Sequence, residues 1–150
     1  GGGTFGKDLL DDVIPFVEQK FRTHKDADNR AIGGLSVGGG QTVAIGFANP
    51  DKFHNIVVMS AGGQNVEENY PGFFKDAAAT NKKLKLLWIG CGRQDFAFER
   101  NKKLSDLLAS RGILNTFRET EGLHNFAIWR RYLAEVAPML FQKSGREISQ

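Results

Sequence analysis

A pentapeptide at residues 34–38, Gly-Leu-Ser-Val-Gly, constrains the fold of this chain more than any other feature. It lies between a predicted strand at residues 30–35 and a predicted helix at residues 37–48. In this context the G-x-S-x-G pattern predicts a nucleophile elbow, a turn so sharp that the serine backbone is strained. Glycines two positions before and after Ser36 are expected to let neighbouring backbone pass without a Cβ clash. The turn would lift the Ser36 hydroxyl clear of the sheet, at a helix N-terminus that favours negative charge.

Hydrophobic periodicity predicts strands that alternate with helices along the rest of the chain. Helices are expected at residues 7–22, 37–48, 97–111 and 125–142, strands at 30–35, 55–60, 84–90 and 113–118, and a loop with one short helix at 61–82. Pro15 predicts a kink or a restart within the first helix. Alternating strands and helices indicate βαβ units. We therefore expect an α/β fold with a mostly parallel sheet flanked by helices, formed by one domain over residues 1–150.

Composition excludes several classes of protein. The net charge is only +3, and the lysines and arginines alternate with acids, so we expect no nucleic-acid partner. No apolar run approaches the roughly 20 residues of a membrane-spanning helix, so no membrane partner is expected. The single cysteine excludes an internal disulfide and a cysteine-based zinc site, and neither a metal nor a cofactor is implied. The start of the chain, Gly1-Gly2-Gly3, has neither an initiator Met nor the apolar stretch of a signal peptide, so we expect a processed or excised chain.

Three side chains that are distant in sequence each follow the end of a predicted strand. These are Ser36, Asp95 and His124. Parallel sheets place reactive groups beyond the carboxyl ends of their strands, so the three should share one rim. A serine hydroxyl needs a base to take its proton, and the base needs an orienting carboxylate. We predict Ser36 as nucleophile, His124 as base and Asp95 as acid, because His24 lies in a polar, exposed stretch and His54 precedes a strand at the opposite end.

Other residues compete for parts of this assignment. Asp95 could instead cap the helix that begins near residue 96. Asp76 is its strongest competitor for the acid, whereas Asp106 lies within a helix and should face solvent. Cys91 lies between two glycines with no basic group beside it, so we expect a small buried thiol at a strand end and not a nucleophile.

Acyl transfer also requires donors for the developing oxyanion. The backbone N–H of Val37, the residue after the nucleophile, is the expected first donor. The second normally comes from a loop after an earlier strand, and nothing before residue 30 looks like a strand with such a loop. Losing one donor typically costs about 10²–10³ in rate. The Gly38-Gly39-Gly40 run lacks the Lys-Ser or Lys-Thr of a phosphate-binding loop, so nucleotide binding is not expected.

The chain resembles the esterase-D-like α/β-hydrolases, and within them the family 1 carbohydrate esterases that include feruloyl and acetyl xylan esterases. Residues 30–40 look like that family's elbow, residues 87–92 with Asp95-Phe96 are similar to its acid-bearing turn, and residues 122–124 with 129–133 are similar to its histidine segment. The resemblance runs from about residue 7 to residue 141. It implies Ser36, Asp95 and His124 as nucleophile, acid and base, and a secreted or periplasmic enzyme that deacylates plant cell-wall xylan.

The resemblance covers only the C-terminal half of the family's α/β-hydrolase domain. In that fold the strand before the elbow is central and pairs with an upstream strand. Residues 31–33 would therefore form an apolar, unpaired edge, which is an aggregation hazard. We expect the missing half to be supplied by an N-terminal-half polypeptide from a cleaved precursor or by a second copy of the chain.

These observations predict a serine carboxyl-ester hydrolase that removes feruloyl or acetyl groups from xylan. Trp129 and Phe126 could flank an aromatic acyl group, although aromatic residues on helices more often lie in a core. A non-catalytic module retained for carbohydrate binding or assembly is the alternative, and the missing oxyanion loop favours it. An acyltransferase is a third possibility, because mycolyltransferases share the fold.

Overall fold

Four parallel strands form the sheet at the centre of the molecule. The computed structural model describes residues 3–142, so residues 1–2 and 143–150 of the predicted domain lie outside the described residues. The strands, in spatial order, are β1 (Ala31–Leu35), β2 (Asn55–Met59), β3 (Leu86–Gly92) and β4 (Thr116–Thr120), and each neighbouring pair is parallel. Because neighbouring strands are parallel, each connection runs from the carboxyl end of one strand back to the amino end of the next. The predicted α/β class with a parallel sheet is confirmed.

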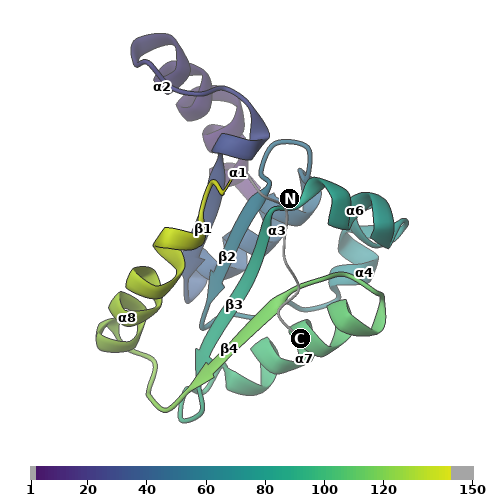
Figure 1. Cartoon of the computed structure of the whole chain (residues 1–150), viewed down its shortest axis with the longest axis vertical. Coiled ribbons are helices and arrows are strands. Elements are labelled where there is room, and N and C mark those ends of the chain that lie inside the picture. The colour runs from purple at the N-terminus through teal and green to yellow at the C-terminus, as the bar shows by residue number, and fades with distance from the viewer. Residues whose placement is uncertain (1–2, 143–150) are drawn as a thin grey trace.

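Helices cover both faces of this sheet (Figure 1). They are α1 (Gly3–Asp8), α2 (Ile14–Lys20), α3 (Val37–Ala48), α4 (Val66–Asn69), α5 (Pro71–Phe74), α6 (Ala77–Lys83), α7 (Phe98–Ser110) and α8 (Phe126–Val136). Helix α8 packs on one face around the buried side chains of Trp88, Trp129 and Tyr132. The opposite face carries α3, α5 and α7, with Phe47, Leu87 and Leu108 in its core. Strands β2 and β3 are buried along their whole length, which explains their continuous apolar sequences.

The sequence placed some boundaries wrongly. Residues 61–82 contain three short helices, α4 to α6, and not one. Strand β4 begins at Thr116 and not at residue 113, because the N–H of Ile113 binds the carbonyl of Leu108 and that of Leu114 binds the Asn81 side chain. The last helix ends at Val136 and not at residue 142. A short 3-10 turn follows at Ala137–Met139, around a proline that has no N–H to continue the helix.

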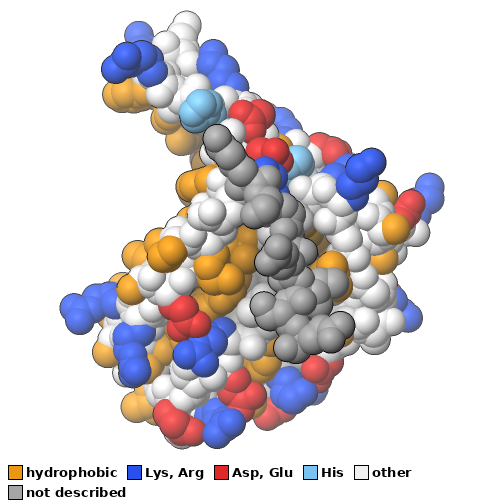
Figure 2. Space-filling view, in the orientation of Figure 1, with side chains coloured by type: hydrophobic (Ala, Val, Ile, Leu, Met, Phe, Trp, Pro, Cys, Tyr) orange, Lys and Arg blue, Asp and Glu red, His pale blue; other side chains and the backbone are white. Residues whose placement is uncertain are grey.

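The first predicted helix restarts near Pro15. Helix α1 leads into a π-helical turn at Leu9–Val13, and α2 then begins at Ile14 with Pro15 in its first turn. The N–H of Ile14 donates to the carbonyl of Leu9, five residues back, so the helical register changes directly before the proline, which has no N–H to donate. The α2 segment projects from the body of the molecule in Figure 1, and Figure 2 shows hydrophobic side chains exposed on it. Among residues 3–142 no helix has the length and hydrophobicity needed to cross a membrane.

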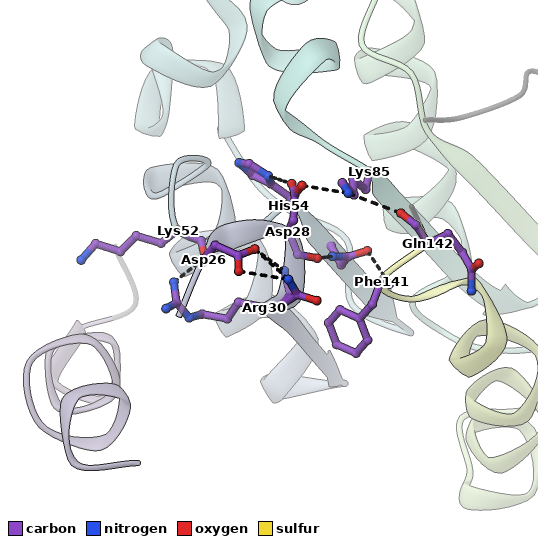
Figure 3. A network of polar contacts seen from close by, with 10 residues as sticks. Asp26, Asp28, Arg30, Lys52, His54, Lys85, Phe141 and Gln142 are labelled. Atoms are coloured by element: carbon purple, nitrogen blue, oxygen red, sulfur yellow. Dashed lines mark hydrogen bonds and ion pairs between the residues drawn. The ribbon is translucent and has the colours of Figure 1, made fainter. Parts of the chain in front are cut away.

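A polar network ties together the amino ends of the strands (Figure 3). One Asp28 carboxylate oxygen lies 2.6 Å from His54 Nδ1, and the other lies 2.8 Å from Lys85 Nζ. Hydrogen bonding from Lys85, and then from His54, lowers the pKa of Asp28. The buried Asn55 side chain donates to the Asp28 carbonyl and accepts from the N–H of Phe141, so the network also anchors the segment after α8. His54 thus lies at the end of the sheet opposite Ser36, as predicted.

Candidate active site

The structure brings Ser36, His124 and Asp95 into one hydrogen-bonded chain. His124 Nε2 lies 2.9 Å from Ser36 Oγ, across 88 residues of sequence. His124 Nδ1 lies 2.9 and 3.0 Å from the two carboxylate oxygens of Asp95. An ionised carboxylate can only accept, so Nδ1 carries the proton and Nε2 is left to accept from the serine hydroxyl. The three side chains predicted from sequence therefore meet at the carboxyl ends of β1, β3 and β4.

The Ser36 backbone has the strained conformation expected of an elbow. Its φ of 53° and ψ of −122° lie outside the regions that non-glycine residues normally occupy. The N–H of Ser36 donates to the carbonyl of Met59 at the end of β2, at 2.9 Å, and its carbonyl accepts from Gly40 in the first turn of α3. Ser36 is therefore held from both sides, between the sheet and the helix that follows. The next N–H, that of Val37, opens α3 and has no acceptor within the helix.

A clash between a Cβ and neighbouring backbone was expected at both motif glycines, but the structure shows it at only one of them. A Cβ on Gly34 would lie 2.3 Å from the carbonyl oxygen of Gly38, so backbone atoms occupy that space. A Cβ on Gly38 would meet nothing within 4 Å, which makes the expected crowding at this second glycine wrong. The crowded position is the next one along: a Cβ on Gly39 would lie 2.6 Å from Ala61 Cβ. The first turn of α3 directs Gly38 away from the sheet and Gly39 toward it.

Asp95 is a buried acid that faces the imidazole. Its residue is 4% exposed, and its side chain accepts from the N–H of Ala97 at 2.8 Å as well as facing His124. It does not cap α7, whose first residue is Phe98. The competing acids have other positions: Asp76 caps α6 by accepting from Ala79, and Asp106 pairs with Lys102 on the surface.

Two loops that carry the acid and the histidine are bonded to each other. The N–H of Arg93 donates to the carbonyl of Thr120 at 2.8 Å, and that of Gln94 donates to the carbonyl of Gly122 at 3.1 Å. The Gln94 side chain then accepts from the N–H of Gly122 at 2.6 Å. These bonds extend the β3–β4 pairing past the strands. They hold the loop that bears His124 against the loop that bears Asp95.

Two aromatic rings contact His124. Phe96 lies 4.3 Å from the imidazole, measured between ring centroids, and is 74% exposed. Trp129 lies 4.9 Å away and perpendicular to the imidazole, but it is buried. Phe126 is exposed and packs its ring perpendicular to that of Trp129. Of the two aromatics predicted from sequence, Phe126 is thus accessible and Trp129 is largely covered. Phe96 was missed, although its place directly after the acid was a usable signal.

The remaining candidate groups have structural positions. Cys91 is fully buried, and burial together with the negative charge of Asp95 raises the pKa of its thiol to about 12. The thiol therefore stays protonated at neutral pH and is no nucleophile, as predicted. His24 is exposed, as predicted. No group of three or more His, Cys, Asp or Glu side chains within residues 3–142 is arranged to hold a metal ion.

The chain matches a known family over nearly its whole length. A model of the family described as "Putative esterase" matches residues 4–140.

This chain belongs to that esterase family.

Its relatives include esterases of two named kinds. An endo-1,4-β-xylanase/feruloyl esterase of Xylanibacter ruminicola is 34% identical over 92% of this chain and 18% of its own length. An acetyl esterase of Caldicellulosiruptor saccharolyticus is 26% identical over 87% of this chain and 61% of its own. Among solved structures, an S-formylglutathione hydrolase of Staphylococcus aureus superposes with a TM-score of 0.75 at 25% identity, over 92% of this chain and 62% of that one. The predicted α/β-hydrolase fold and esterase family are confirmed, and the chain spans less than two thirds of each of these relatives.

The two motif glycines offer a matched pair of substitutions. We expect Gly34→Ala to lower the free energy of unfolding by about 1–3 kcal/mol, because the new methyl group would overlap the Gly38 carbonyl. Gly38→Ala should be neutral or stabilising by up to about 1 kcal/mol, because alanine favours the helix and the space is open. Urea unfolding followed by circular dichroism measures both. Equal stability of the two variants would contradict this account of the elbow.

Proposed function

We propose that this protein is a serine carboxyl-ester hydrolase that acts through an acyl-enzyme. The observation that carries the proposal is the continuous contact from Ser36 through His124 to Asp95, with 2.9 Å between the hydroxyl oxygen and the imidazole nitrogen. Membership of an esterase family supports the same reaction class. Each residue then has one role: Ser36 is the nucleophile, His124 the base and acid, and Asp95 the group that orients the imidazole.

The geometry supports a two-stage reaction. Ser36 Oγ attacks the ester carbonyl while its proton passes to His124 Nε2, and a tetrahedral oxyanion forms. His124 then returns that proton to the departing alcohol oxygen as the carbon–oxygen bond breaks, leaving the acyl group on Ser36. Water attacks the acyl-enzyme with His124 again as base, and the carboxylic acid is released. Asp95 stabilises the imidazolium that forms in both stages by accepting from Nδ1.

The oxyanion requires donors at the elbow. The Val37 N–H is suited to this role because it opens α3 directly after the nucleophile, where the helix dipole also favours negative charge. Residues 3–30 contain only helices and loops, in keeping with the sequence prediction that they hold no strand with a following oxyanion loop. We propose that the second donor comes from a polypeptide outside these residues, placed beside β1.

The proposed substrates are feruloyl or acetyl esters of plant cell-wall xylan. The names of two relatives, a xylanase/feruloyl esterase and an acetyl esterase, support this class. Exposed Phe96, whose ring contacts the His124 imidazole, offers apolar surface to an aromatic acyl group, and exposed Phe126 lies next to Trp129, the other aromatic neighbour of His124. Action on cell walls would place the enzyme in a secreted or periplasmic location. The alternative of a non-catalytic carbohydrate-binding or assembly module is less well supported, because such a module has no need for three aligned catalytic groups.

A fluorophosphonate probe tests the reaction class. We expect covalent labelling at Ser36, abolished in Ser36→Ala and strongly reduced in His124→Ala, because the hydroxyl needs its base. Intact-mass and peptide mass spectrometry measure the adduct, and His54→Ala is the matched control, since His54 lies at the opposite end of the sheet. Failure to label with the remainder of the domain present would favour the non-catalytic module.

A small ester panel tests the substrate class. We expect hydrolysis of methyl ferulate or acetylated xylan with a higher kcat/KM than that of p-nitrophenyl acetate, as measured by product release. Acyl transfer to added alcohols in excess of hydrolysis would instead indicate an acyltransferase. Should methyl ferulate be the preferred ester, Phe96→Ala should raise KM for it more than for the acetyl esters, because only the aromatic acyl group needs that ring.

We also propose that an N-terminal-half polypeptide completes the sheet at β1. Within residues 3–142, β1 pairs only with β2, and Gly33 is exposed on its open side. Apolar grooves of about 530 and 390 Å³ lie against β1, one beside α1 to α3 and one beside α8. The family members described above extend well beyond the matched region, since the chain covers only 61–62% of two of them. A second copy of this chain is the alternative occupant.

The oligomeric state tests this pairing. The isolated chain should self-associate or precipitate, because an open apolar edge strand pairs with other chains. Addition or co-expression of the upstream polypeptide should give a soluble complex with restored esterase activity. Size-exclusion chromatography with mass spectrometry measures both. A monodisperse 16.6 kDa monomer with full activity would refute the proposal, and an active homodimer would show that a second copy is the partner.

A further inference from the structure

Ser60 is a second serine with strained backbone near the candidate site. It directly follows β2, its φ is 53°, and its residue is only 1% exposed. Its N–H donates to the carbonyl of Gly90 at 2.9 Å, which extends the β2–β3 pairing by one residue. A non-glycine residue in such a conformation costs of order 1–3 kcal/mol and persists where its surroundings determine it. Burial excludes Ser60 as a nucleophile toward an ester, so its hydroxyl has another use.

The hydroxyl of Ser60 holds one indole ring. Trp129 Nε1 donates to Ser60 Oγ at 2.8 Å, in a part of the structure closed to solvent. A buried indole N–H without an acceptor would cost about 1–3 kcal/mol, so this bond determines how the ring lies. The same indole stands perpendicular to the His124 imidazole, at 87° and 4.9 Å between centroids. Ser60 is thus connected to His124 through one intervening side chain, the indole of Trp129.

This ring lies beside the residue with the most demanding geometry. His124 must present Nδ1 to Asp95 and Nε2 to Ser36 at once, at 2.9 Å each. Both contacts lie in the plane of the imidazole ring. They restrain tilting of the ring out of that plane less strongly. On the solvent side its neighbour is Phe96, which is itself exposed. Trp129 is the buried neighbour, so it is the one that can restrain that plane.

We propose that Ser60 is a positioning residue for ester hydrolysis. Through its hydrogen bond to Trp129 it holds the indole against the imidazole, and so maintains the His124 orientation that joins Ser36 to Asp95. This inference rests on the proposed function of that site, but its structural part does not depend on turnover. The strained backbone of Ser60 is explained by the same requirement, because it directs Oγ toward the indole N–H.

Substitutions that remove either end of the bond test the proposal in the complete, active protein. Ser60→Ala and Trp129→Phe should each lower kcat by about 10- to 100-fold with little change in KM, since small misplacement of a catalytic group costs up to about 10²-fold. The double variant should lose no more than the worse single variant. Tyr132→Phe is the matched control: it removes another hydroxyl contact of α8, the half-buried one to Thr120, and should leave kcat unchanged.

Ser60→Gly separates positioning from strain. Glycine adopts a positive φ without cost, so this variant should be at least as stable as Ser60→Ala and yet equally slow. The proton NMR resonance of the His124 Nδ1–H bonded to Asp95 should shift or broaden in both variants and stay unchanged in Tyr132→Phe. Recovery of kcat in Ser60→Gly, additive losses in the double variant, or an unchanged resonance would each overturn the inference. If the wild type neither hydrolyses esters nor labels at Ser36, the proposed function fails while the resonance still tests the positioning.

Discussion

The parallel pairing of β1 with β2 is the constraint on which the rest of the site depends. It places the end of β1 beside Met59, whose carbonyl accepts the N–H of Ser36. That bond holds the serine in a conformation that neither a strand nor a helix would allow, so the chain turns sharply into α3. Since β3 and β4 run in the same direction, the loops of Asp95 and His124 reach the same rim. Three groups from distant parts of the sequence meet because all four strands run in the same direction and end at the same rim.

The buried and the exposed sides of this site contribute differently. The buried side supplies orientation: Asp95 is held by a backbone N–H, and Trp129 by the hydroxyl of Ser60. The exposed side offers apolar surface, because the ring of Phe96 lies against the His124 imidazole and is itself largely exposed. The ester hydrolysis that we propose needs both, since the imidazole would have to stay aligned while an ester enters and an alcohol leaves. The polar network of Asp28 lies at the opposite end of the strands, away from the chemistry.

Sequence patterns predicted the elements well where one physical cause dominated. The continuous apolar runs of β2 and β3 indicated buried parallel strands, and the proline at position 15 indicated a helix restart. Boundaries failed where tertiary contacts overrode periodicity. The N–H groups of Ile113 and Leu114 are taken by α7 and by Asn81, so β4 starts later than its apolar pattern suggested. The second motif glycine was assigned a crowding that belongs to its neighbour, because motif spacing does not record which way a helical residue points.

The sequence by itself determined which chemical groups are present: a serine in an elbow pattern, and a histidine and an aspartate after later strand ends. It also carried the resemblance to an esterase family. These follow from residue type and order, which local backbone preferences translate directly. Only the tertiary structure decided that His124 Nε2 lies 2.9 Å from Ser36 Oγ, that Asp95 faces the imidazole instead of capping α7, and that Ser60 holds Trp129 beside it. Such contacts depend on strand register and on packing between layers, and no local pattern encodes the distance between side chains that lie tens of residues apart.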